Sequence, residues 1–320
     1  MEASDADQML ATYLHWYGPA TFLRCPHQST LTDVDIGLIG VPYSGGNIIE
    51  RMQYLGPRAV RNRSAGYHRA HREFGIDPFA LVRVRDLGDA PISRSIHPDL
   101  AAEDFQRFFE SVFHAGITPI SVGGDHSVTW PILRAARATH FPAPLGMIHF
   151  DSHTDAPPAM DATRNTAAGF RLGAEDGVID PERTVQIGIR GPMGGLAQDD
   201  WAKEHFARVI TTAEFVARGA DEVRQEIQRV IGDGPAYLSF DLDAIDPAYA
   251  PGVADPEVGG LTMREVLQVL HGLRGTSLMG ADVVCYCPPL DNAAQLTALT
   301  ASALLLEFVT LIADNLSRDR

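Results

Sequence analysis

Cysteine is scarce in this chain, with only Cys25, Cys285 and Cys287 among 320 residues. An odd and sparse set of cysteines excludes a disulfide framework, and the Cys-x-Cys spacing of the last two is not that of a zinc knuckle. No apolar run approaches the roughly 18 residues that a membrane span needs. The N-terminal residues also lack the pattern of a signal peptide. We therefore expect a cytoplasmic protein that has no membrane partner.

Positive charge is also in short supply. Lys and Arg number 26 against 41 Asp and Glu, which gives a formal net charge of -15. This balance argues against nucleic acid or an anionic membrane as a partner. It suits a small cationic substrate, although acidic residues also serve solubility.

Apolar runs of strand length alternate with helical periodicity along the whole chain, without a repeat or a low-complexity linker. The expected strands cover residues 35–41, 81–84, 117–122, 145–150, 184–189, 208–211, 236–240 and 279–284. Such alternation predicts an α/β fold, a single three-layer α-β-α domain around a mostly parallel sheet of about eight strands. We assign residues 31–320 to this catalytic domain. Residues 1–30 form an N-terminal arm that packs either on its own domain or on a neighbouring subunit.

Acidic and histidine side chains gather directly after the third, fourth and seventh expected strands. They are His126, Asp151, His153, Asp155, Asp241 and Asp243. The carboxyl ends of parallel strands meet at one edge of a sheet, where ligands usually bind. Carboxylate oxygens and imidazoles without cysteine suit a divalent first-row metal better than a structural zinc site. Six such groups overcrowd one ion, so we expect two metals that share bridging carboxylates.

Three segments resemble the signature blocks of the ureohydrolase family, which includes arginase, agmatinase and guanidinobutyrase. The segments are Gly123-Gly124-Asp125-His126-Ser127, Asp151-Ser152-His153-Thr154-Asp155 and the stretch from Ser239 to Pro247. The similarity runs from the Gly-Val-Pro turn at Gly40 to the last helix, and the arm is more similar to agmatinase-like members than to arginases. The resemblance therefore implies an arginase-like fold and a metal-dependent hydrolase.

The same resemblance implies two divalent metal ions per chain, Mn²⁺ in most members and Ni²⁺ in some. One ion would be held by His126, Asp151, Asp155 and Asp241, and the other by Asp151, His153, Asp241 and Asp243. A hydroxide bridging the ions would attack the guanidinium carbon. Asp151 and Asp155 would be catalytic, with Asp155 as the proton shuttle to the leaving nitrogen. Asp246 is expected to be a turn residue or a partner of the metal ligands, and His149 either a packing residue or such a partner.

Two positions depart from the family pattern, and both concern the substrate. Thr166 stands where many members carry a histidine, and Cys285 stands where a guanidinium-binding glutamate is usual. The loss of the glutamate removes a charge-assisted clamp on a planar cation. The candidate substrate-binding residues are therefore Thr166, Cys285, Tyr286 and Glu175.

Three functional hypotheses follow. The first is hydrolysis of an atypical guanidine or biguanide, similar to a nickel-dependent metformin hydrolase of the family. The second is a conventional agmatinase or guanidinobutyrase type of amidinohydrolase that releases urea, with the missing groups supplied by residues such as Glu175 or Asp176. The third is a non-catalytic subunit that supports an active paralogue. Relatives are mostly trimers or hexamers, so we expect a homo-oligomer or a hetero-oligomer with a paralogous subunit.

Overall fold

The computed structural model describes residues 18–47, 52–139, 141, 143–157 and 168–318. Its centre is an eight-stranded sheet in the order β2-β1-β3-β8-β7-β4-β5-β6, and neighbouring strands pair in parallel. The strands are β1 Ile36–Val41, β2 Val84–Asp89, β3 Thr118–Gly123, β4 Leu145–Phe150, β5 Ile179–Ile189, β6 Arg208–Thr211, β7 Ala236–Asp241 and β8 Leu278–Val284. The parallel α/β fold that the sequence predicts is therefore confirmed.

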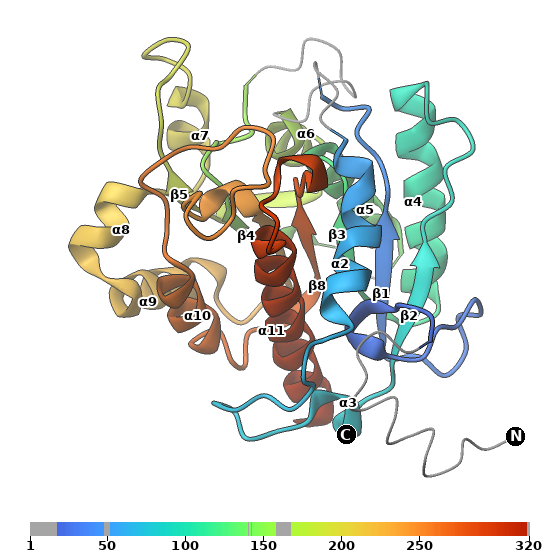
Figure 1. Cartoon of the computed structure of the whole chain (residues 1–320). Helices are drawn as coiled ribbons and strands as arrows, with labels where there is room; N and C mark the ends of the chain where they lie inside the picture. The colour runs from blue at the N-terminus through green and yellow to red at the C-terminus, as the bar shows by residue number, and fades with distance from the viewer. Residues whose placement is uncertain (1–17, 48–51, 140, 142, 158–167, 319–320) are drawn as a thin grey trace, which may run out of the picture.

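Helices cover both faces of the sheet and complete the three layers (Figure 1). One face carries α2 Gly56–Ser64, α8 Thr212–Arg218, α9 Ala220–Ile231, α10 Met263–His271 and α11 Leu296–Arg318, and the short α3 Pro78–Leu81 lies against α11. The other face carries α4 Pro98–His114, α5 Thr129–Thr139, α6 Gly169–Glu175 and α7 Asp200–His205. Alternate residues of β4 serve the two layers, since Phe150 packs into one apolar core and Met147 into the other. This is the pattern of a strand that is buried on both faces.

Helix α11 corrects the expectation that the chain has no apolar stretch long enough to span a bilayer. It has 23 residues, and an 18-residue window within it has a mean hydropathy of 2.0. The window is 83% buried inside the protein, against the sheet and the neighbouring helices. Its apolar surface is thus already used in the core of the fold.

Several element boundaries differ from the expectation, and β5, for example, begins at Ile179 rather than at residue 184. The helical segment of residues 212–231 is divided at Gly219, whose φ of 80° lies outside the helical region. The cap of α8 is Thr211, whose side chain accepts a hydrogen bond from the Glu214 N–H at 3.1 Å. The second strand begins only at Val84, because Leu81 belongs to α3.

The described part of the N-terminal arm packs on its own domain. Phe22 and Leu23 are fully buried. The Phe22 N–H donates to Asp86 Oδ2 at 2.9 Å, and the Leu23 N–H donates to Ser64 Oγ at 3.1 Å. Residues 1–17 lie outside the described part of the chain, so the subunit contact assigned to the arm stays a prediction.

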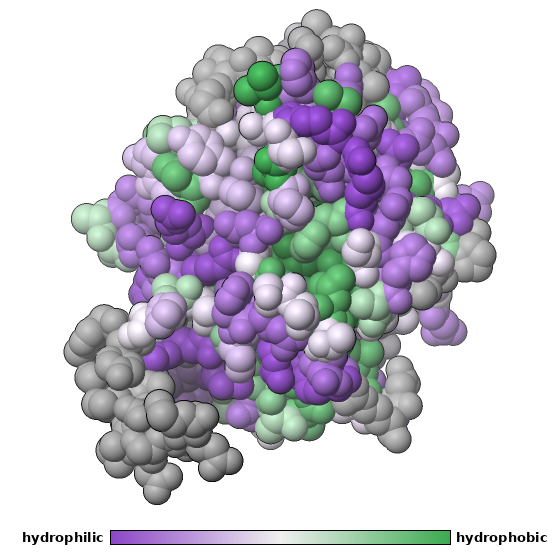
Figure 2. All heavy atoms as spheres, turned by 90° about the vertical axis from the view of Figure 1, so that its right-hand side faces the viewer, coloured by the Kyte–Doolittle hydropathy of each residue, from purple (hydrophilic) through white to green (hydrophobic). Residues whose placement is uncertain are grey.

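Figure 2 views the molecule from the side that carries α4 in Figure 1. Hydrophilic side chains cover much of this face, and apolar atoms show mainly near its middle. The largest apolar side chains, such as Phe105 and Phe109 of α4, are instead buried against the sheet. The polar and apolar residues thus separate as the helical periodicity of this segment predicts.

Candidate metal centre

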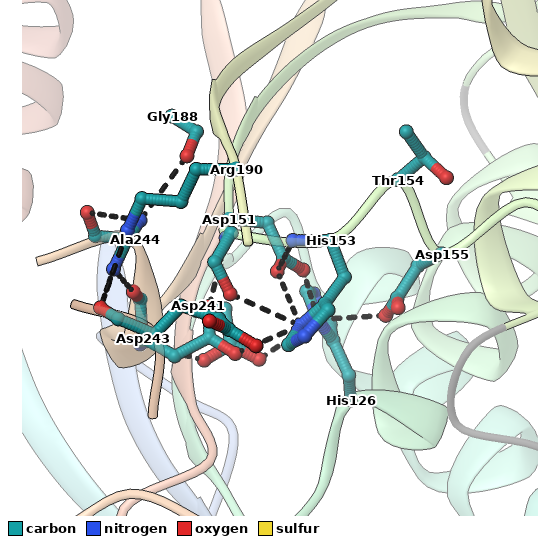
Figure 3. A network of polar contacts seen from close by, with 12 residues as sticks. His126, Asp151, His153, Thr154, Asp155, Gly188, Arg190, Asp241, Asp243 and Ala244 are labelled. Atoms are coloured by element: carbon teal, nitrogen blue, oxygen red, sulfur yellow. Dashed lines mark hydrogen bonds and ion pairs between the residues drawn. The ribbon is translucent and has the colours of Figure 1, made fainter. Parts of the chain in front are cut away.

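Four adjacent strands in the middle of the sheet deliver the candidate site residues from their carboxyl ends. They are β3, β8, β7 and β4. The 3-10 turn η3 (His126–Val128) follows β3, the segment from Asp151 to Asp155 follows β4, and η5 (Leu242–Ala244) follows β7. The six side chains therefore converge on one small region, as Figure 3 shows. The sequence placed them at one edge, and the strand order makes them neighbours.

The imidazole of His126 lies at the centre of the first group of acidic side chains. Its Nδ1 atom is 3.1 Å from Asp151 Oδ2, 3.1 Å from Asp155 Oδ2 and 3.2 Å from Asp241 Oδ2. This nitrogen is buried and makes no hydrogen bond within the described part of the chain. A buried nitrogen among three carboxylate oxygens is poorly satisfied unless a cation sits between them. The donor set thus fits a divalent metal.

A chain of hydrogen bonds fixes which nitrogen of His126 faces this group. Ser239 Oγ donates to Asp282 Oδ1 at 2.7 Å, so its oxygen accepts from the Nε2–H of His126 at 2.9 Å. The lone pair of Nδ1 is then directed at the carboxylates, as a metal ligand requires. Asp282 also accepts from Thr129 Oγ1 at 2.8 Å and from the Tyr237 hydroxyl at 3.0 Å, which fixes its own position.

The second group shares a carboxylate with the first. His153 Nδ1 lies 3.0 Å from Asp243 Oδ2 and 3.5 Å from Asp151 Oδ1. Asp151 therefore turns one oxygen toward His126 and the other toward His153. This arrangement suits a carboxylate that bridges two neighbouring cations.

His149 supports the bridging carboxylate from behind. Gln186 Nε2 donates to His149 Nδ1 at 3.0 Å, so the opposite nitrogen carries the proton and donates to Asp151 Oδ2 at 2.9 Å. The ring also stacks on Phe170, with 3.7 Å between centroids. His149 thus serves both as a packing residue and as a partner of a candidate ligand, the two roles that the sequence left open.

Burial and charge shift the protonation of the cluster in opposite directions. Burial opposes the charge of His153, but its hydrogen bonds to Asp151 and Asp243 raise its pKa to about 12. Burial and then the charge of Asp241 raise the pKa of Asp243 well above its usual range. Burial also raises the pKa of Asp155, helped by the charge of Asp151. Without a cation the cluster therefore holds protons that a metal would have to displace.

A cavity of about 440 Å³ opens onto these side chains. It is lined by Asn47, Gln53, His126, His153, Thr154, Asp155, Pro157, Gln198, Asp241, Asp243, Ala254, Asp255 and Cys285. Asp155 and Cys285 adopt positive φ angles of 46° and 67°. Such strained backbone conformations persist where the surrounding structure holds them, often around a functional site.

The predicted substrate-binding residues do not all reach this cavity. Cys285 lines it, and burial, reinforced by the charge of Asp241, raises the pKa of its thiol well above the usual range. Tyr286 is buried and donates to Asp291 Oδ2 at 3.0 Å, so it does not line the cavity. Glu175 lies half exposed at the end of α6 in an ion pair with Arg171, away from the cavity lining. Thr166 falls outside the described residues.

The alternative acid Asp176 is also engaged elsewhere, since it accepts a hydrogen bond from Trp130 Nε1 at 3.0 Å. Asp176 therefore does not supply the missing substrate-binding group. The sequence shows which residues follow a strand or helix. The direction in which each side chain points depends on the register of the neighbouring strand.

Two further residues hold the segment that carries Asp243. The Arg190 guanidinium donates to the carbonyl of Asp243 at 2.6 Å and to that of Ala244 at 3.1 Å (Figure 3). Asp246 accepts hydrogen bonds from the N–H groups of Gly259 and Gly260 at 2.8 and 3.0 Å. Asp246 is therefore a turn residue, one of the two roles expected for it.

The supporting residues Ser239, Asp282 and Gln186 were missed by the sequence reasoning. All three lie in β5, β7 or β8, and all three are fully buried. The available signal was a polar residue inside an otherwise apolar strand, because a buried polar group needs a partner.

A parallel α/β sheet with carboxylates and imidazoles converging at its carboxyl edge is the architecture of a metal-dependent hydrolase.

Comparisons with known proteins support this class. The arginase family profile matches residues 34–310. The guanidinopropionase of Pseudomonas aeruginosa is 43% identical over 303 residues, which cover 94% of each chain. The guanidinobutyrase of the same organism is 33% identical over 300 residues, which cover 92% of each chain.

A solved structure of a related enzyme has the same fold. The proclavaminate amidino hydrolase from Streptomyces clavuligerus superposes with a TM-score of 0.88 at 32% identity, over 94% of this chain and 99% of that one. The chain belongs to the arginase family, whose members are hydrolases that act on C–N bonds of guanidino compounds. The family resemblance seen in the sequence motifs is thereby confirmed.

Proposed function

We propose that this chain is an amidinohydrolase of the conventional kind, which cleaves a C–N bond of a small guanidino compound and releases urea. The observation that carries the proposal is the 43% identity to a guanidinopropionase across nearly the full length of both chains. The guanidinobutyrase and the proclavaminate enzyme also act, by their names, on guanidino compounds. These similarities favour the conventional hypothesis over the atypical biguanide hypothesis, which no comparison supports.

Two divalent ions would complete the site, and the arginase family normally holds a pair of Mn²⁺ ions. We assign His126, Asp151, Asp155 and Asp241 to one ion, and Asp151, His153, Asp241 and Asp243 to the other. When bound, the ions supply a water molecule that loses a proton near neutral pH and is thus a nucleophile. The choice between Mn²⁺ and Ni²⁺ is part of the test below, since these ligands suit both.

The protein's own groups would position the substrate and move the proton. The water oxygen forms a bond to the guanidinium carbon, and the bond from that carbon to the substituted nitrogen breaks. Asp155 lines the cavity, so its carboxylate would be placed to take a proton from the attacking water and pass it to the leaving nitrogen. The products are urea and an amine.

We further propose a cytoplasmic homotrimer or homohexamer, with the N-terminal arm of residues 1–30 at a subunit contact. Sedimentation of the full chain and of a form that begins at residue 18 tests this assembly. A smaller oligomer of the shortened form supports the contact, and identical sedimentation contradicts it.

A substrate panel after metal reconstitution tests the activity. The chain is loaded with Mn²⁺ or Ni²⁺, its metal content is measured, and urea and amine are assayed. The panel contains 3-guanidinopropionate, 4-guanidinobutyrate, agmatine, arginine and a biguanide. We expect about two ions per chain and the fastest turnover on a guanidino acid. Turnover on the biguanide alone would restore the atypical hypothesis, and two bound ions without any turnover would favour a supporting subunit.

A further inference from the structure

The cavity needs a hydrogen-bond acceptor for the planar cation, and most of its polar groups are already engaged. The carboxylates of Asp155, Asp241 and Asp243 lie against the imidazoles of the candidate metal centre. Cys285 lines the wall but brings no carboxylate to it. The acceptor must therefore come from the remaining wall.

The other polar residues of that wall can be taken in turn. Gln198 Oε1 accepts from the Gly194 N–H at 2.7 Å, and Thr154 Oγ1 donates to Asp199 Oδ1 at 3.2 Å. Asn47 already interacts with another residue. Asp255 is exposed at the rim, where water weakens its attraction for a cation. These four residues are thus poorly suited to hold a buried guanidinium.

Gln53 differs from all of them. Its side chain lines the cavity and only 1% of its surface is exposed. Its Oε1 atom is buried and has no hydrogen-bond partner in the part of the chain that the structure describes. Native proteins rarely leave such an acceptor unpaired, because its lost hydration is not replaced. An unpaired acceptor on a residue that lines a ligand cavity is explained when the ligand supplies the donor.

The backbone around Gln53 supports a role in binding. Gln53 begins the 3-10 turn η2 (Gln53–Leu55), and Met52 before it has a φ of 64°, a conformation that disfavours side chains. The joint between η2 and α2 lies against the segment after β8, since a Cβ added at Gly56 would be 3.1 Å from the Tyr286 carbonyl oxygen. The fold thus keeps Gln53 in the same wall as Cys285, at the cost of a strained residue.

We propose that Gln53 is a substrate-binding residue, whose side-chain carbonyl accepts a hydrogen bond from the guanidinium group beside the metal centre. This inference rests on the proposed function and names the residue that recognises its substrate class. A neutral amide oxygen accepts a directional hydrogen bond from an N–H of the cation and adds no charge to the site. It supplies an acceptor in a wall where Cys285 offers no carboxylate.

Calorimetric titration of the metal-loaded chain with guanidinium chloride, and separately with urea, tests the proposal. Gln53→Met keeps the length of the side chain but removes the acceptor, and we expect it to weaken guanidinium binding about tenfold. Gln53→Glu adds a charge-assisted bond and should strengthen guanidinium binding several-fold, with a smaller effect on neutral urea. Gln106→Met, on α4 and away from the cavity, is the matched control and should bind both probes as the unchanged chain does.

Metal content, melting temperature and kinetics show whether Gln53→Met weakens guanidinium binding directly or by disturbing the fold. Gln53→Met should keep the metal content and melt no lower than the unchanged chain, because it removes a buried unpaired acceptor. With the best substrate of the panel, its KM should rise more than its kcat falls. Guanidinium binding that is equal in the unchanged chain and Gln53→Met, or absent from both, overturns the inference.

The binding assay also separates this inference from the proposed function. A chain that turns over a guanidino acid, but whose KM and guanidinium affinity do not respond to Gln53→Met, keeps the function and loses the inference. A chain without turnover whose guanidinium affinity depends on Gln53 keeps the inference and loses the proposed reaction.

Discussion

At the scale of single residues, the candidate site depends on how each imidazole is oriented. His126 presents Nδ1 to three carboxylates because Ser239, which is held by Asp282, accepts a hydrogen bond from the Nε2–H. Gln186 orients His149 by donating a hydrogen bond to its Nδ1. Residues that never touch a metal therefore decide whether the ligands are ready to bind one.

Ser239→Ala tests this orientation. Loss of the hydroxyl frees the His126 ring to rotate or to adopt the other tautomer, so we expect the affinity for Mn²⁺ to fall about tenfold. Competition with a chelator of known affinity measures the change. Ser302→Ala is the control, since Ser302 is also buried but its hydroxyl donates to the Ala298 carbonyl of its own helix. Equal affinities in the two variants would contradict the proposed orientation.

At the scale of elements, a buried acid joins α11 and α10 to the segment before α3. Glu307 of α11 lies 3.0 Å from His71 Nε2 and 3.2 Å from His271 Nε2. Two imidazoles and a carboxylate suggest a further metal site. However, the Phe74 N–H donates to His71 Nδ1 at 3.1 Å, so His71 Nε2 carries the proton and has no lone pair for a metal. The cluster is a hydrogen-bonded joint between elements.

This joint predicts a pH dependence of stability. Burial opposes the charge of Glu307, yet the hydrogen bonds from His271 and His71 lower its pKa. Its stabilising effect is therefore present above the unfolded pKa of about 4.3 and is lost as the pH falls through the lower folded pKa. The Glu307 carboxylate, 3.2 Å from Nε2 of His271, raises the pKa of this imidazole. That contribution is present below the unfolded pKa of about 6.5 and is lost as the pH rises through the higher folded pKa.

Both contributions are present between about pH 4.5 and 6.5. We expect Glu307→Gln to lower the free energy of unfolding by about 1–2 kcal/mol near pH 5.5. The loss should be smaller at pH 9, where His271 is neutral in both variants. Urea denaturation at the two pH values measures both changes. Glu222→Gln, at an exposed position of α9, is the control, and a loss that is larger at pH 9 would refute the argument.

At the scale of the whole molecule, the candidate metal centre connects segments that are far apart in the chain. His126 and Asp243 come from strands that are separated by more than a hundred residues in sequence, yet both approach Asp151 or its neighbours. Ions that bind only the folded chain stabilise it by mass action. Without the ions, folding brings buried carboxylates of like charge close together, and their repulsion lowers the free energy of unfolding.

Removal of metal should therefore lower the melting temperature. At an ion concentration of about 1,000 times the Kd, binding contributes about 4 kcal/mol to stability. We expect EDTA to lower Tm by several degrees at pH 8, measured by calorimetry against the Mn²⁺-loaded chain. The difference should shrink at pH 5.5, because protons compete with the ions for His126 and His153. His126→Ala should melt alike with and without Mn²⁺, and an unchanged Tm in the original chain would argue against the centre.

The sequence by itself determined the order of the eight strands and the residues that follow each strand. The apolar run 145–150 and the Asp-x-His-x-Asp segment after it are local patterns, which can be recognised without knowledge of distant contacts. The motifs also identified the family. Misplaced boundaries arose where one residue decided the local conformation, as Gly219 does between α8 and α9.

Only the tertiary structure decided which side chains face the cavity. Tyr286 follows Cys285 directly, yet it turns toward Asp291, and Glu175 ends a helix on the surface. Gln53 lies far from the metal motifs in sequence, and the fold brings it into the cavity wall with Cys285. Strand order, register and the packing of loops on one another set these directions. They depend on contacts between distant segments, which a pattern of neighbouring residues does not contain.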